Sequence, residues 1–201
     1  MLPENIIYIS LVTTIVGISF LIRDILIGKT KPNLVTWFFW SLAPLVGVYL
    51  QLKAGAGLSV LPVFLVGFAP LIIFAIALIK KNSYWKLTVF DILCGVFSLV
   101  ALILYILTRN TAVSIAFAIA SDAFAGIPTL VKSWKFPETE TAIGYLPGIL
   151  NNILGLLIIK NWIFSIYSFG IYIIIINSIL IIFISRKKIM DLLNKYAIFK
   201  S

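Results

Sequence analysis

The chain has 201 residues, of which 62% are hydrophobic and only 11% are charged, and its mean hydropathy is +1.13. So few polar residues cannot cover the surface of a water-soluble globule, which excludes that class and predicts an integral membrane protein. Backbone polar groups in lipid must be paired internally, so long apolar runs are expected to be helices and the fold class all-α.

Composition also limits the chemistry. The chain has one cysteine, Cys94, and no histidine, which leaves neither a disulfide framework nor the usual zinc or redox ligands. It carries no pairing of nucleophile and base and no phosphate-binding glycine loop. We therefore expect no enzyme, no metal and no cofactor. The net charge of +9 is interpreted as a sign of orientation in a lipid bilayer, and no nucleic-acid partner is expected.

Seven apolar segments follow one another with short connections, and each is long enough to cross a bilayer as a helix. Because no room remains for a soluble domain, function is expected between the helices. The segments are residues 5–22, 34–52, 59–79, 87–107, 111–131, 141–159 and 163–185.

The basic residues separate between alternate connections. Only Lys53, Arg109 and Lys160 fall on one side, and the other 13 of the 16 basic residues fall on the opposite side. Cytoplasmic loops carry the excess of Lys and Arg. This predicts a multi-pass protein of the cell membrane with its N-terminus outside and its C-terminus in the cytoplasm.

The two halves of the chain are weakly similar, at an offset of 103 to 105 residues. The offset carries the first three spans onto the last three and leaves the fourth as a connector. We expect two parallel three-helix bundles, residues 1–82 and 110–201, joined by a linker helix within 83–109. Parallel repeats occur in transporters whose sites lie at the repeat interface. The matching pairs are Pro32 with Pro137, Thr36 with Thr141, Pro44 with Pro147 and Gly67 with Gly170.

The segment Gly126-Ile-Pro-Thr-Leu-Val-Lys-Ser-Trp-Lys135 resembles the Pro-Gln loop at the inner end of the first helix of each repeat in the PQ-loop superfamily. The chain is similar in layout and size to the SWEET sugar transporters of that superfamily. The resemblance implies alternating access by a carrier of a sugar or another small polar solute, with hinges at Pro44, Pro128 and Pro147. A receptor or assembly protein on the same fold is the alternative, and a homo-oligomer is compatible with either.

Asp122 is the most informative single residue. It lies 11 residues after Thr111 and 10 before Lys132, which places it near the middle of the fifth span, where a carboxylate is costly and usually functional. Small or polar residues at steps of three or four, Thr129 among them, share its helix face. We expect Asp122 and Thr129 to line a solute cavity, with Asp122 binding solute or coupling its movement to protons. A buried structural hydrogen bond is the alternative.

Three asparagines lie at a similar depth, Asn151 and Asn152 in the sixth span and Asn177 in the seventh. Their amides offer both donors and acceptors to a solute, and Asn177 is similar in position to an asparagine that contacts sugar hydroxyls in SWEET proteins. Hydrogen bonding between helices is the competing interpretation.

Other polar or aromatic residues have simpler explanations. Trp37 and Trp40 are placed near the inner interface, as in an aromatic belt, with stacking on a solute as the alternative. Asp24 and Asp91 lie at span ends, where surface pairing is expected.

Overall fold

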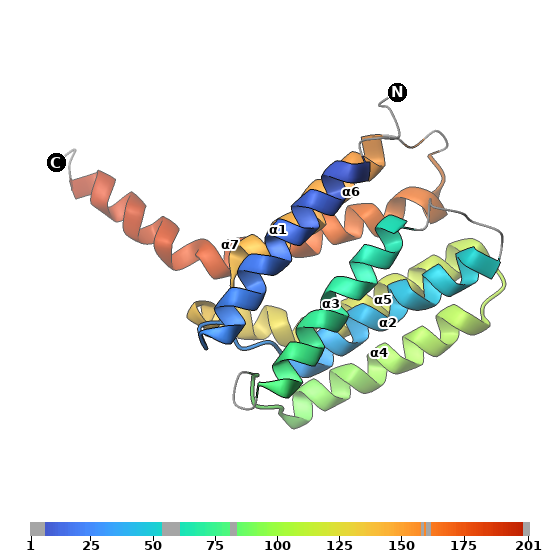
Figure 1. Cartoon of the computed structure of the whole chain (residues 1–201), viewed down its shortest axis with the longest axis horizontal. Coiled ribbons are helices and arrows are strands. Elements are labelled where there is room, and N and C mark those ends of the chain that lie inside the picture. The colour runs from blue at the N-terminus through green and yellow to red at the C-terminus, as the bar shows by residue number, and fades with distance from the viewer. Residues whose placement is uncertain (1–6, 54–60, 81–83, 158, 160–161, 199–201) are drawn as a thin grey trace.

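The computed structural model describes residues 7–53, 61–80, 84–157, 159 and 162–198, and within them it is all-helical, with no strand. Each of the seven predicted spans corresponds to a helix (Figure 1). The helices are α1 Ile7–Leu26, α2 Leu34–Lys53, α3 Leu61–Ile79, α4 Val89–Leu107, α5 Thr111–Lys135, α6 Leu146–Leu157 and α7 Phe164–Ile198.

Four helical segments are long and apolar enough to cross a membrane, which makes the fold compatible with a membrane protein. Shorter apolar stretches lie in α2, in α3 and from Ala142 to Leu157. The four longer segments are Tyr8–Leu26, Val89–Leu107, Thr111–Lys135 and Phe164–Arg186.

Two helix ends show why the chain starts a helix where it does. Asn110 precedes α5, and its side-chain oxygen accepts hydrogen bonds from the amides of Ala112 and Val113. Thr88 and Asp91 form a capping box at the start of α4, where each side chain bonds to the backbone amide of the other. These bonds satisfy amides that have no partner within the helix.

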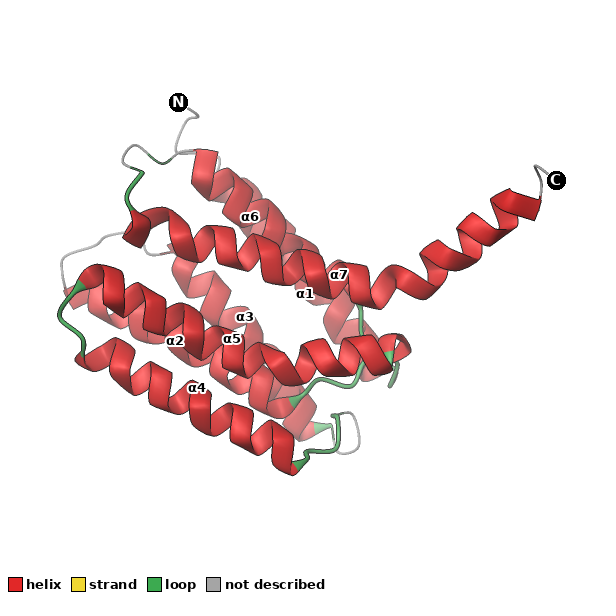
Figure 2. Cartoon of the chain, turned by 180° about the vertical axis from the view of Figure 1, so that it is seen from behind, coloured by secondary structure: helices red, strands yellow, loops and turns green. Residues whose placement is uncertain are grey.

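The helix ends also differ from the predicted ones. α5 continues four residues beyond the predicted end, to Lys135, and α7 continues to Ile198 and projects from the bundle (Figures 1 and 2). α6 is only 12 residues long, about 18 Å at the usual rise per residue. A short 3-10 helix, η4 (Ala142–Tyr145), precedes α6 directly, so the predicted sixth span is divided into two kinds of helix.

The helices pack in a regular order. α3 packs on both α1 and α2, and α7 packs on both α5 and α6 (Figure 1). Further contacts join α1 to α6 and α2 to α5, and α4 packs on α5 and α2. A buried apolar cluster of Leu21, Ile25, Trp37, Ile73 and Leu180, with Tyr145, connects α1, α2, α3 and α7.

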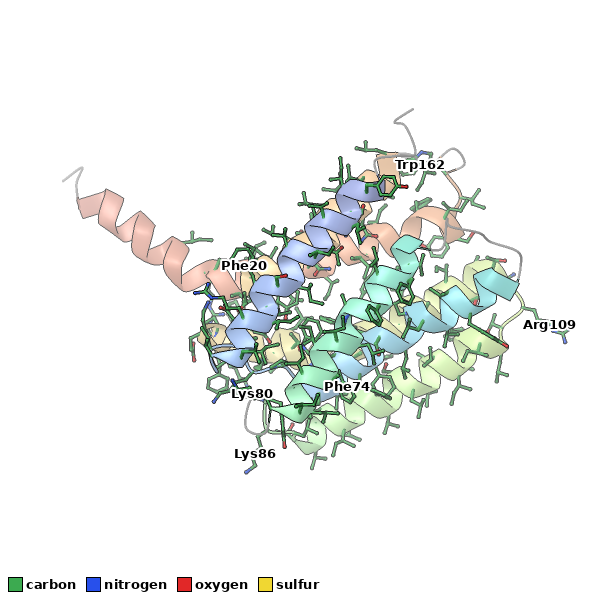
Figure 3. All side chains as sticks on the ribbon, in the orientation of Figure 1. Phe20, Phe74, Lys80, Lys86, Arg109 and Trp162 are labelled. Atoms are coloured by element: carbon green, nitrogen blue, oxygen red, sulfur yellow. The ribbon has the colours of Figure 1, made fainter. Side chains whose placement is uncertain are left out.

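The two ends of the bundle differ in charge. Lys80 and Lys86 lie at one end, while Arg109 and Trp162 lie at the other (Figure 3). The end that carries Lys80 and Lys86 is called the basic end below. The connections α1–α2, α3–α4 and α5–α6 meet there. The Lys31 amide donates to the Thr139 carbonyl, and the Trp85 amide donates to the Pro32 carbonyl. Residues 1–6 and 199–201, which include both termini of the predicted topology, lie outside the described residues.

Candidate functional site

A cavity of about 130 Å³ lies among α1, α2, α3, α5, α6 and α7. Asp122, Asn151, Asn152 and Asn177, which the sequence had separated by up to 55 residues, all line it. One buried water needs roughly 10–15 Å³ of such space. The cavity can therefore hold several waters or a small solute, and it is called the central cavity below.

Asp122 is held by two aromatic side chains. The Tyr172 hydroxyl on α7 donates to the Asp122 Oδ2 atom at 2.7 Å, and the Trp40 indole Nε1 on α2 donates to the Asp122 carbonyl at 3.1 Å. Only 5% of Asp122 is exposed. No basic side chain lies among the described residues that line the central cavity, so the carboxylate has no ion-pair partner there.

The three asparagines differ in how much of their amide remains for a solute. Asn151 is engaged at both ends, because Thr13 donates to its oxygen at 2.7 Å and its nitrogen donates to Thr14 at 2.9 Å. This makes Asn151 a link between α6 and α1. In contrast, the recorded bonds of Asn152 and Asn177 use only the Nδ2 atom, each to a carbonyl four residues earlier on its own helix.

Thr129 lies elsewhere. It is completely buried, and its hydroxyl donates to the Thr36 hydroxyl at 2.9 Å, while Thr36 donates to the Ala125 carbonyl at 2.7 Å. Thr129 is absent from the lining of the central cavity. Within the described structure, Thr129 therefore joins α5 to α2 by a hydrogen bond.

Aromatic side chains form the wall of the central cavity toward the basic end. The ring centroids of Trp37 and Trp40 are 5.5 Å apart, and Tyr145 lies 6.3 and 6.4 Å from them. Trp37 is 5% exposed and its Nε1 atom has no partner within the described residues. The aromatic-belt interpretation is therefore wrong for Trp37, which packs inside the bundle because α2 is covered by its neighbours. Trp40, half-buried, lines the same cavity.

A second cavity of about 360 Å³ lies on the other side of the asparagines. It shares Asn151, Asn152 and three apolar residues with the lining of the central cavity. It continues past Tyr105 at the end of α4 and Ser10 at the start of α1, toward the end of the bundle that carries Arg109. The polar lining thus extends away from the basic end.

A buried ion pair lies beneath the aromatic wall at the basic end. Lys132 Nζ is 2.5 Å from Glu140 Oε1, and the two side chains are 1% and 0% exposed. Lys132 also donates to the Lys31 carbonyl, and the Tyr145 hydroxyl donates to Glu140 Oε2 at 3.0 Å. We call Lys132, Glu140, Tyr145 and the Lys31 carbonyl the lock. It connects the α1–α2 connection to α5 and to the α5–α6 connection.

Two further carboxylates at this end are buried, although Asp24 forms the expected ion pair with an exposed side chain, that of Lys29. Asp24, 5% exposed, accepts from Lys29 at 2.5 Å and from the Thr141 hydroxyl at 2.6 Å. Asp91, 4% exposed, accepts from Asn33 at 3.1 Å as well as capping α4. Both acids are buried because connections that are distant in the sequence close over them.

The predicted hinge prolines occupy different kinds of position. Pro44 and Pro128 lie inside α2 and α5. Pro147 is the second residue of α6, directly after the 3-10 helix η4. A Cβ atom added at Gly17 would lie 2.3 Å from the Pro147 ring, which shows how closely α1 and α6 approach. The sequence interpretation omitted Pro70, which lies inside α3 and lines the central cavity.

The sequence interpretation also missed Tyr172 and the lock. Tyr172 lies on α7 among apolar residues, and a phenol in such a span is itself a signal, because a buried hydroxyl needs a partner. Lys132 had been assigned only to the cytoplasmic charge. Within the described residues, no group of three or more potential metal ligands occurs.

Comparison with known protein families, with curated proteins and with solved structures finds no match to this chain.

Proposed function

We propose that this protein is a membrane transporter that moves a small polar solute by alternating access, on a fold similar to that of the SWEET branch of the PQ-loop superfamily. The observation that carries the proposal is the central cavity. Asp122 and three asparagines, which lie at a similar depth on three different helices, line this one internal space together with two tryptophans. A purely structural role would require no such space around an acid without an ion-pair partner.

The packing order supports the two-unit architecture of such a transporter. In each proposed unit the third helix lies between the first and the second, as α3 does for α1 and α2 and α7 does for α5 and α6. The units meet where α1 packs on α6 and where α2 packs on α5. A two-fold rotation that exchanges the units, α1 with α5 and α2 with α6, would also exchange these two contacts. α4 packs outside on α5 and α2, as a linker helix would.

The position of the lock favours a conformation closed at the basic end. The aromatic wall and the Lys132–Glu140 pair lie on one side of the central cavity, and the second cavity lies on the other. Alternating access requires one closed side at a time. Opening the basic end would separate the Lys31 carbonyl from Lys132, which belong to different proposed units.

Counterflow in proteoliposomes tests the proposal. Vesicles loaded with one unlabelled solute from a panel of sugars, amines, amino acids and organic acids should accumulate the labelled form transiently. Asp122→Asn should reduce this signal, whereas Glu138→Gln, an exposed acid at the basic end, should leave it intact. If no solute in the panel exchanges, the transport proposal is rejected in favour of a receptor or assembly role.

We also propose that the basic end faces the cytoplasm, because Lys and Arg are retained on that side. Two exposed positions at opposite ends, Arg109 and Lys86, provide matched sites for single cysteines in a Cys94→Ala background. A membrane-impermeant maleimide should label Arg109→Cys in intact cells and Lys86→Cys only after permeabilisation. The reverse pattern would contradict the orientation.

A further inference from the structure

The groups that the central cavity offers to a solute are carboxyl and amide groups, with no basic side chain among the described residues that line it. One oxygen of Asp122 accepts from Tyr172, and the Trp40 N–H also lies beside the carboxyl group, but no basic side chain among the described lining residues neutralises it. The amide nitrogens of Asn152 and Asn177 each donate one N–H to their own helix, which leaves both amide oxygens and a second N–H on each nitrogen. A carboxylate and amide oxygens together suit a ligand that donates N–H groups.

The electrostatic setting selects the charge of that ligand. No described residue that lines the central cavity is basic, and its wall toward the basic end consists of Trp37, Trp40 and Tyr145. Aromatic faces attract cations, and a carboxylate in a membrane interior is expensive without a countercharge. A solute with an anionic group would find no basic partner here, which disfavours carboxylates, phosphates and zwitterionic amino acids.

One donor in the wall adds a second requirement. The Trp37 indole N–H is buried and has no hydrogen-bond partner within the described residues. A buried polar group without a partner carries a desolvation cost. A hydroxyl or carbonyl oxygen on the solute would satisfy it.

We propose that the central cavity binds a small organic monocation, a primary or secondary amine that also carries a neutral oxygen acceptor. The ammonium group of the ligand contacts Asp122 and the oxygens of Asn152 and Asn177. The neutral oxygen of the ligand accepts from Trp37. This inference rests on the proposed function, since it names the class of solute that the same cavity carries.

Three probes of matched size test the class of ligand on the full-length protein in nanodiscs. They are aminopropanol, which is a cation at neutral pH, propanediol, which is neutral, and hydroxypropionate, which is an anion. Thermal unfolding and tryptophan fluorescence measure binding, with empty nanodiscs as the control. Aminopropanol alone should stabilise the protein, and Asp122→Asn should weaken its affinity at least tenfold, whereas Glu138→Gln should not. Equal stabilisation by propanediol or hydroxypropionate, or unchanged affinity in Asp122→Asn, would overturn the inference.

Flux measured in parallel separates this inference from the transport proposal. Binding of aminopropanol that depends on Asp122, without its entry into proteoliposomes, would reject transport and support the cation site. Saturable exchange of a neutral sugar that aminopropanol does not inhibit would support transport and reject the cation site. Exchange of labelled aminopropanol that is lost in Asp122→Asn would support both.

Discussion

The lock at the basic end gives the sharpest prediction about mechanism. At 2.5 Å, the attraction between Lys132 and Glu140 is about 7 kcal/mol for an effective dielectric constant of about 20. Desolvation costs several kcal/mol for each ion, so the net contribution of the pair is small. Removing one partner is different, because it leaves a buried charge uncompensated at a cost of about 3–5 kcal/mol.

Glu140→Gln is the perturbation of choice, because glutamine retains an oxygen for the Tyr145 hydroxyl and removes only the charge. We expect the protein to lose about 3–5 kcal/mol of stability in the state closed at the basic end. If the substitution destabilises only the closed state, each 1.4 kcal/mol shifts the equilibrium between the closed and open states tenfold toward the open state. Lys132→Met should act in the same direction, and the double variant Lys132→Met/Glu140→Gln should recover most of the stability, because it leaves no unpaired ion.

Cysteine accessibility measures the shift directly. Ala69 lines the central cavity, and Ala69→Cys in a Cys94→Ala background gives one small reporter there. In vesicles that expose the basic end, a membrane-impermeant maleimide should label this cysteine slowly in the parent protein and at least tenfold faster with Glu140→Gln. Labelling at the parental rate in both single variants, with unchanged thermal stability, would refute the idea that the lock holds this end closed.

Two further predictions concern packing around the central cavity. Tyr172→Phe removes the donor to Asp122 and should lower stability by about 1.5–3 kcal/mol, as expected for a hydrogen bond to a charged group, measured by thermal unfolding; unchanged stability would argue that the carboxylate is solvated by water instead. Gly17→Ala should destabilise by about 1–3 kcal/mol through overpacking against Pro147, whereas Gly155→Ala, where an added Cβ meets nothing within 4 Å, should be neutral or stabilising in the same assay.

The seven helices could be predicted from the sequence because long apolar runs favour helices, and four of these segments are long and apolar enough to cross a membrane. Depth along each helix could be predicted for the same reason. Asp122, Asn152 and Asn177, which were predicted at a similar depth, all line the central cavity. The direction in which a residue faces was less certain. Thr129 shares a helix face with Asp122 by spacing, yet it packs against Thr36, because that face is wide enough to meet both a neighbouring helix and the central cavity.

The lock could not be predicted, because its residues come from three segments that meet only after the helices have packed. Charge counting assigned Lys132 to orientation alone. The same limitation affected Asp24, whose partner Thr141 lies 117 residues away. Local rules describe what a segment can do in lipid or water, whereas burial at the end of the bundle depends on which connections cover it.

The buried acids of the described residues support a distinct role for Asp122. Asp24 has a lysine and a threonine as partners, Asp91 has the α4 cap and Asn33, and Glu140 has Lys132 and Tyr145. Each of these acids lies at the basic end and has at least two side-chain or backbone donors or a countercharge. Asp122 lies in the middle of α5 with two aromatic donors, Tyr172 and Trp40, and an adjoining cavity. The acids at the basic end have their partners within the fold, whereas Asp122 adjoins a cavity and has no countercharge there, which is why we propose that it meets a solute.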